Sequence, residues 1–190
     1  MMNQKSSFMG SLVIFATLSL YPAFVSADET RQDVCDVVQA SFATLTKSQE
    51  PVYPRDTEAS SGSLMLEGIQ VQSRSGMVML KGLGGSPLAK FALREDELSD
   101  LISQQVKYSQ DHFLPECDWK GKALPIGTGT TSVKFSNPIF SSNSQLAVIS
   151  VSFVASWRYG PNAFGGHGDI CVLRRVGSDW IAQCLPTWIQ

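Results

Sequence analysis

The stretch ICVLRRVGSDWIAQCL (170–185) decides the fold of the C-terminal part of the chain. Two runs rich in β-branched and apolar residues flank Gly177-Ser178, a two-residue turn of the type that begins with glycine. The pattern therefore predicts a β-hairpin with a fixed register. Counting outward from the turn pairs Val176 with Asp179, Arg175 with Trp180, Leu173 with Ala182, and Cys171 with Cys184.

The register makes Cys171 and Cys184 direct cross-strand neighbours. Antiparallel pairs alternate between hydrogen-bonded and non-hydrogen-bonded positions, and the pair beside a two-residue turn is hydrogen-bonded. Counting outward, the two cysteines fall on a non-hydrogen-bonded pair, where the α-carbons lie closest. That spacing is at the short end of what a disulfide accepts.

The chain has 4 cysteines, which allow three pairings. The hairpin register selects Cys171–Cys184 and leaves Cys35–Cys117 to tie the first helix to the segment after the second. The alternative is a redox pair or a metal site. The sequence has no C-x-x-C and no histidine or further cysteine at ligand spacing. We therefore expect two structural disulfides, no metal site and no cofactor.

The first residues are typical of a secretory signal peptide. Lys5 supplies a positive charge, residues 12–25 are almost wholly apolar, and Val25-Ser26-Ala27 puts small residues where a signal peptidase cuts. The apolar stretch is too short to span a bilayer, which takes about 20 residues. We expect a signal peptide at 1–27 and a periplasmic or secreted protein starting at residue 28.

Charge excludes several classes of partner. The chain has 15 basic and 17 acidic residues, and only Lys5 precedes residue 28, so the exported part carries a small negative charge. This argues against nucleic acid and against an anionic membrane surface as partners. No later segment is long or apolar enough for a membrane span. Residues 28–190 are long enough for a single exported domain.

Hydrophobic spacing predicts two helices. The first runs from about Thr30 to Lys47, with a capping-box-like start at Thr30 and Asp33. The second runs over 94–110, with three acids in its first turn, where the helix dipole favours negative charge. Its expected apolar stripe consists of Leu98, Leu101, Ile102 and Val106.

The remaining segments divide into strands and loops. Residues 51–63 are rich in proline, serine and glycine and indicate an exposed loop. Residues 63–72 and 77–83, joined by Ser-Arg-Ser-Gly, indicate a hairpin. The stretch 145–159 indicates a long strand. One of its faces is apolar, and the other is mixed, so that face is expected to line a groove or meet a partner.

The C-terminal segment from FSNPIFSSNSQLAVISVSF to GDICVLRRVGSDWIAQCLPTWI resembles the tail of small exported bacterial domains. The plan of an N-terminal helix followed by a curved antiparallel sheet is similar to the nuclear transport factor two-like superfamily. The resemblance covers about residues 135–189. That superfamily hosts both enzymes and binding domains, so the resemblance implies a fold and not a function.

Catalytic chemistry is weakly represented in the sequence. It has no G-x-S-x-G, no Walker A and no H-E-x-x-H motif. Of the two histidines, His112 falls at the end of the second helix. His167 could form an acid–base cluster with Asp169 and Tyr159. His167 and Asp169 stand two residues apart on a glycine-rich stretch, FGGHGDI (164–170), which we interpret as a hairpin bend without a fixed geometry, so we assign no catalytic residue.

A binding role fits this bend better. Aromatic and arginine side chains are enriched where partners dock, and loops on rigid scaffolds often carry function. The alternative is that the aromatic residues fold back onto the sheet. The predicted binding residues are Arg158, Tyr159, Phe164, His167 and Asp169.

Together the patterns predict an α+β domain: an N-terminal helix, a hairpin, a second helix, then a curved antiparallel sheet ending in a disulfide-stapled hairpin. We expect a non-catalytic exported domain that binds another protein, such as an inhibitor of, or immunity protein against, a cell-envelope hydrolase. The alternative is a small-molecule-binding or enzymatic domain with a cone-shaped pocket beneath the sheet, lined by Trp157, Phe153 and Asp169. A third reading is a structural envelope component with an exposed apolar patch.

Overall fold

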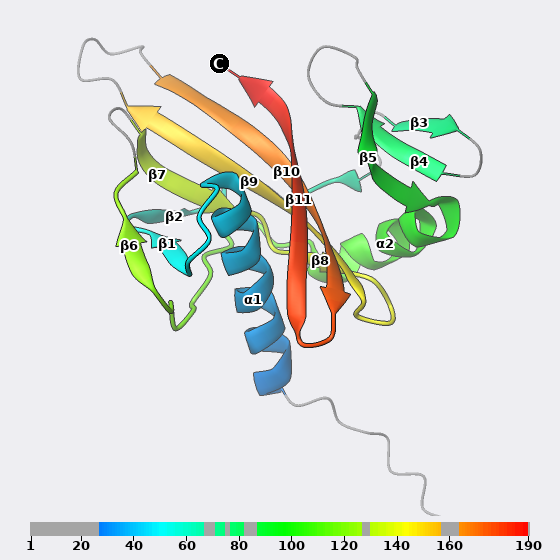
Figure 1. Cartoon of the computed structure of the whole chain (residues 1–190), viewed down its shortest axis with the longest axis horizontal. Helices are drawn as coiled ribbons and strands as arrows, with labels where there is room; N and C mark the ends of the chain where they lie inside the picture. Colours follow the sequence, from blue (N-terminus) through cyan, green and yellow to red (C-terminus); the bar gives the residue numbers. More distant parts are fainter. Residues whose placement is uncertain are drawn as a thin grey trace, which may run out of the picture.

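The computed structural model describes residues 27–66, 71–74, 77–81, 87–126, 130–156 and 164–189 of the 190-residue chain. Helix α1 (Ala27–Leu45) packs on one face of a six-stranded sheet and helix α2 (Glu95–Tyr108) packs on the other (Figure 1). The α+β class is confirmed. The expected signal peptide lies outside the described residues, except for Ala27, which begins α1.

The sheet has the strand order β11-β10-β9-β7-β2, with β8 also paired to β9. All its pairs are antiparallel except β2 with β7, which is parallel, so the sheet is mixed and mainly antiparallel. Its strands are β2 (Thr57–Ala59), β7 (Thr130–Phe135), β8 (Ile139–Phe140), β9 (Leu146–Ser156), β10 (Phe164–Val176) and β11 (Asp179–Ile189).

The final hairpin has the predicted register. Val176 faces Asp179, and Cys171 faces Cys184 with α-carbons 4.0 Å apart in a disulfide. Gly177 has a φ of 65°, the left-handed value that the first position of the turn requires. The second predicted disulfide, Cys35–Cys117, is also present and ties α1 to the segment after α2.

Both faces of the first part of the long strand β9 are buried. Ala147, Ile149 and Val151 pack against α1, whereas Leu146 and Val148 belong to a second apolar cluster with Leu101 of α2. The sequence analysis expected the face with mixed polar and apolar residues to line a groove or meet a partner. Along the first part of β9 this face is covered by α2.

The second helix begins and ends close to its predicted limits. The backbone N–H of Arg94 donates to Glu97 Oε2 at 2.9 Å, as in a capping box. One position of the predicted apolar stripe is wrong, because Val106 is 80% exposed. Gln105 is buried instead, where its Oε1 accepts a hydrogen bond from the Leu66 N–H at 2.9 Å.

The proline-rich segment predicted as an exposed loop contains two short strands. β1 (Val52–Pro54) pairs in parallel with β6 (Lys122–Leu124), and β2 pairs with β7. Val52 and Pro54 are buried. Local composition missed these strands because their partners lie about 70 residues away along the chain.

A hairpin lies between the two helices, but the bounds predicted for its first strand are wrong: residues 63–66 are not in a strand, and Ser73 and Arg74 of the expected turn belong to β3 (Val71–Arg74). β3 and β4 (Met77–Lys81) are antiparallel, and β5 (Pro87–Arg94), which the sequence analysis did not predict, adds a third strand. This small sheet leads directly into α2.

Candidate functional site

The glycine-rich stretch FGGHGDI is part of strand β10 and not a bend. Its backbone pairs with β9 on one side and, from His167 onward, with β11 on the other. These two ladders satisfy the backbone groups, which outweighs the weak strand preference of glycine. The predicted residues Arg158 and Tyr159 lie outside the described residues, and Phe164 begins the strand.

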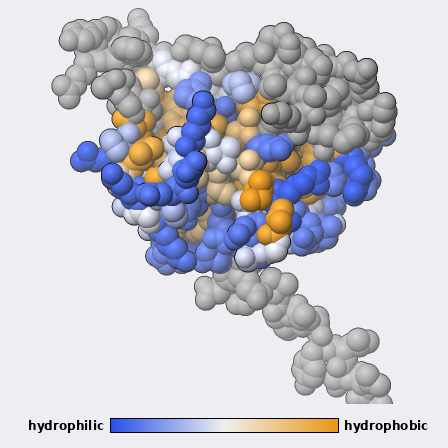
Figure 2. All heavy atoms as spheres, viewed as in Figure 1, coloured by the Kyte–Doolittle hydropathy of each residue, from blue (hydrophilic) through white to orange (hydrophobic). Residues whose placement is uncertain are grey.

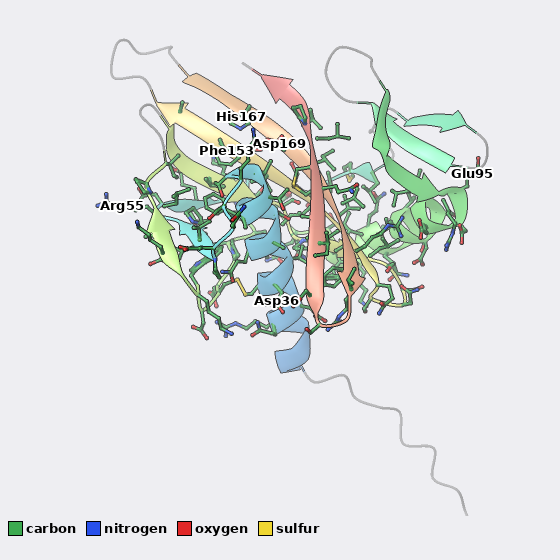
Figure 3. All side chains as sticks on the ribbon, in the orientation of Figure 1. Asp36, Arg55, Glu95, Phe153, His167 and Asp169 are labelled. Carbon is green, nitrogen blue, oxygen red and sulfur yellow. A yellow bond between two sulfur atoms is a disulfide. The ribbon has the colours of Figure 1, made fainter. Side chains whose placement is uncertain are left out.

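His167 and Asp169 are two residues apart on β10, so their side chains lie on the same face of the sheet. His167 Nε2 is 3.6 Å from Asp169 Oδ2. The side chain of His167 is 48% exposed, whereas that of Asp169 is 8% exposed. Figure 3 shows both near the C-terminal end of α1, on the face of the sheet that the helix covers.

Aromatic stacking holds the imidazole of His167. Its ring lies on Phe153, with centroids 4.6 Å apart and planes 15° from parallel (Figure 3). Phe153 faces His167 across the β9–β10 ladder and in turn stacks on Phe42 of α1 at 6.3 Å. The column Phe42–Phe153–His167 connects the helix core to the exposed imidazole and fixes where that ring stands.

Asp169 is a buried carboxyl with an unused acceptor. Its Oδ2 has no hydrogen-bond partner among the described residues. Burial raises the pKa of Asp169, and the nearby His167 acts in the opposite direction. A buried polar atom without a hydrogen bond is costly, so the fold holds this carboxyl at an energetic penalty.

The backbone pairing beside Asp169 is irregular. A bulge between Gly168 and Asp169 places Asp169 opposite Pro186, which has no N–H to donate. The Thr187 hydroxyl, close by on β11, donates to the Gly168 carbonyl at 3.0 Å and not to the carboxyl. The bulge therefore changes the direction of β10 at Asp169.

An oriented imidazole beside a carboxyl offers two kinds of chemistry. It can hold a partner through a hydrogen bond and a stacked ring, or it can move a proton at an exposed ring nitrogen. The sequence analysis named His167 and Asp169 as a possible cluster and Phe153 as a pocket-lining residue, but it did not predict that His167 stacks on Phe153. That contact depends on the register of β10 against β9, which the intervening residues do not reveal.

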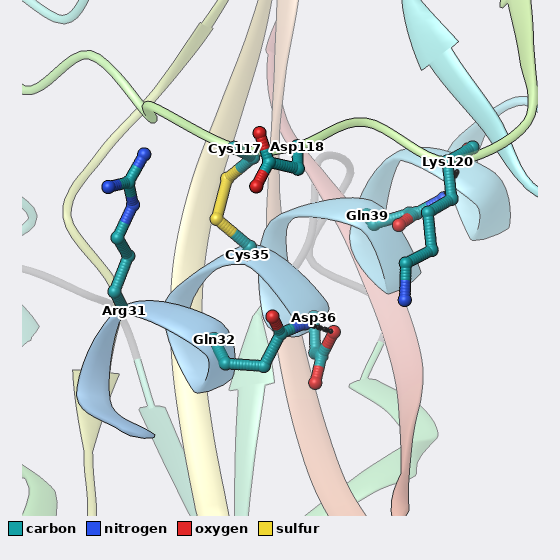
Figure 4. A pocket seen from close by; sticks show the side chains of 8 residues that line it. All are labelled: Arg31, Gln32, Cys35, Asp36, Gln39, Cys117, Asp118 and Lys120. Carbon is teal, nitrogen blue, oxygen red and sulfur yellow. Dashed lines mark hydrogen bonds between the residues drawn. A yellow bond between two sulfur atoms is a disulfide. The ribbon is translucent and has the colours of Figure 1, made fainter. Parts of the chain in front are cut away.

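A hollow lined mainly by polar residues lies beside the Cys35–Cys117 disulfide (Figure 4). Its side chains are used to attach α1 to the segment after α2. Arg31 donates from Nε and Nη2 to the Glu116 carbonyl at 3.1 and 2.7 Å, and Gln39 donates to the Lys120 carbonyl at 2.8 Å. We interpret this hollow as part of the scaffold.

Comparison with known proteins found no matching family model, no matching curated protein and no matching solved structure. The similarity to the nuclear transport factor two-like superfamily therefore stays a prediction. The two disulfides support an oxidising, extracellular-type environment. Within the described part of the chain, no helix has the length and apolar character needed to cross a membrane.

Proposed function

We propose that this chain is a non-catalytic, exported domain that binds another protein through the end of the sheet marked by His167 and Asp169. The observation that carries the proposal is the exposed imidazole stacked on Phe153 in front of a buried carboxyl whose Oδ2 has no hydrogen-bond partner among the described residues. A surface aromatic ring fixed by stacking loses little conformational entropy on binding, and the carboxyl supplies a specific acceptor.

The scaffold suits a rigid recognition surface. The strand that carries His167 continues into the hairpin closed by Cys171–Cys184, and α1 behind it is tied down by Cys35–Cys117. Preorganised surfaces of this kind bind without a large ordering cost. Inhibition of, or immunity to, a hydrolase of the cell envelope fits the size of the domain and a periplasmic or secreted location.

A second candidate function is catalysis or small-molecule binding at the same site. It is favoured by the raised pKa of Asp169, because perturbed carboxyls beside a histidine are frequent in active sites. In this reading Asp169 orients His167, and the imidazole accepts or donates the proton of a bound substrate. Trp157, which was expected to line the pocket together with Phe153 and Asp169, lies outside the described residues.

The test uses the protein expressed from its full reading frame, purified oxidised and immobilised. Envelope extracts are passed over it, retained proteins are identified, and their affinities are then measured with purified components. His167→Asn is compared with His112→Asn, which changes the other histidine, an exposed residue with a φ of 61° that asparagine tolerates. A variant with Tyr159, Phe164 and His167 all changed to alanine completes the set.

We expect one hydrolase to be retained by the wild type and by His112→Asn, and to bind His167→Asn at least tenfold more weakly. Undiminished affinity for the triple-alanine variant would exclude this surface. If neither the wild type nor any variant retains a protein, the second candidate is favoured. Thermal-shift screening of small molecules against the wild type and Asp169→Asn then follows.

A further inference from the structure

A groove of about 580 Å³ lies between α1 and the turn of the final hairpin. It is separate from the His167 site, because its lining includes none of His167, Asp169 and Phe153, the residues labelled at that site in Figure 3. The loop at Glu50 and Pro51 lines it as well, and Ser178 and Asp179 of the hairpin turn contribute to its lining.

The charged residues of the groove are mostly acidic. Asp36, Glu50 and Asp179 line it, and Lys120 is the basic residue among the described lining residues. None of the three carboxylates forms an ion pair with a described residue. By contrast Asp33, one turn earlier on α1, is 3.4 Å from Arg175 Nη1. With three carboxylates and one ammonium among its lining residues, the groove carries a net negative charge.

The apolar lining comes from Ala40 and Ala43 of α1, Pro51 and Trp180. Trp180 is 6% exposed and held from two sides, with Phe140 edge-on at 5.8 Å and the Arg175 guanidinium 5.6 Å above its ring. Its Nε1 has no hydrogen-bond partner among the described residues. The small helical residues leave space beside this fixed ring.

The hairpin surface outside the groove is different in character. Figure 2 shows a hydrophobic patch over the hairpin of β10 and β11, where Val176 and Ile181 are exposed. Ile181 lies on the opposite face of β11 from Trp180, so this patch does not belong to the groove.

We infer that the groove binds an extended, basic segment of another protein, in which lysine or arginine residues alternate with small apolar ones. In such a segment the cationic side chains lie against Asp36, Glu50 and Asp179. The small side chains between them lie on Ala40, Ala43 and Trp180. The groove lies at the start of β11, the outermost strand of the sheet, where an extended segment fits most readily. Charge complementarity gives both attraction and selectivity.

The probe is a fluorescein-labelled peptide of four Lys-Ala repeats with blocked ends, and a peptide of four Glu-Ala repeats is the control. Binding is measured by fluorescence polarisation at about 30 and about 300 mM salt, since exposed charges are largely screened at the higher value. Backbone amide shifts are mapped by NMR. We expect the Lys-Ala peptide to bind, to weaken with salt, and to shift amides of residues 36–43, 50 and 178–180.

Two triple variants separate the groove from general electrostatics. Asp36→Asn with Glu50→Gln and Asp179→Asn removes the groove carboxylates, and we expect about tenfold weaker binding. The matched control, Asp56→Asn with Asp111→Asn and Glu116→Gln, changes the net charge equally at exposed positions elsewhere, and it should bind like the wild type.

Three outcomes overturn the inference: the two triple variants bind the Lys-Ala peptide equally more weakly, neither variant changes its affinity, or the peptide does not bind the wild type. His167→Asn should leave peptide binding unchanged. The groove and the His167 surface can therefore fail independently.

Discussion

Glu97 of α2 and Arg174 of β10 form a two-bond ion pair that joins the second helix to the strand carrying His167 and Asp169. Arg174 Nη1 donates to Glu97 Oε1 at 2.9 Å and Nη2 donates to Oε2 at 3.0 Å. The side chain of Glu97 is 10% exposed, and its Oε2 also accepts the N–H of Arg94. One carboxylate therefore caps α2 and fastens it to the sheet.

The first prediction concerns Glu97→Gln. Hydrogen bonds from Arg174 lower the pKa of Glu97 below its ordinary value of 4.5. A lowered folded-state pKa contributes stability above the ordinary value, and that stability is lost as the pH falls through the folded-state value. We expect Glu97→Gln to cost about 1 kcal/mol at pH 7, because Arg174 is half-exposed. Urea unfolding from pH 7 to pH 3 should show this difference shrinking; a constant difference would contradict the ion-pair explanation.

Asp169→Asn should change the stability of the fold in the opposite direction from Glu97→Gln. Burial raises the pKa of Asp169 above its ordinary value of 3.8, so ionising this carboxyl costs the folded state free energy. The cost is absent below pH 3.8, grows as the pH rises toward the folded-state pKa, and is complete above it. We expect Asp169→Asn to stabilise the fold by about 1 kcal/mol at neutral pH. Lower stability of the variant at pH 7 would show that the carboxylate is paired in solution.

The two disulfides should differ in their contribution to stability. Cys35–Cys117 closes a loop of 82 residues and Cys171–Cys184 one of 13. Loop-closure entropy gives about 4 kcal/mol for the first and about 3 kcal/mol for the second. Denaturant unfolding of the two double-alanine variants measures these values. A larger loss for Cys171→Ala with Cys184→Ala would mean that the hairpin disulfide acts through the folded state.

Gly121→Ala should be far more damaging than Gly177→Ala. Gly121 has a φ of 105°, and a Cβ there would meet the Pro51 carbonyl oxygen at 1.9 Å. That oxygen accepts the Lys122 N–H that joins β6 to β1. Gly177 has a φ of 65°, but a Cβ there meets nothing within 4 Å. We expect a loss of more than about 2 kcal/mol for Gly121→Ala and about 1 kcal/mol for Gly177→Ala, measured by thermal unfolding.

The fifth prediction concerns Leu101 and Val106, two residues of the expected apolar stripe of α2. Leu101 is fully buried, while Val106 is 80% exposed. Leu101→Ala should cost about 2–5 kcal/mol, and Val106→Ala less than about 0.5 kcal/mol, in equilibrium denaturation. A large loss for Val106→Ala would mean that this side chain is covered in solution, either by a partner or by a second copy.

Local chemistry was enough to predict the final hairpin. Gly177 supplies the positive φ of the turn, and the alternation of ladder pairs then brings Cys171 to Cys184 and leaves Cys35 to Cys117. The limits of α2 followed from the acids of its first turn and the spacing of its apolar residues. The hairpin and α2 depend on residues close together in the chain, and the Cys35–Cys117 pair follows by elimination once Cys171 is paired with Cys184, so the sequence by itself determined them.

The tertiary structure decided what depends on partners far apart in the chain. The strands within residues 51–63 exist because β6 and β7 pair with them, and Gln105 is buried in place of Val106 because Leu66 supplies a donor. His167 and Asp169 could be named from the sequence, but they stand on a paired strand and not on a bend. The stacking of His167 on Phe153 and the groove beside Trp180 arise only when α1, β9 and the hairpin meet, since their packing is set by long-range register and burial.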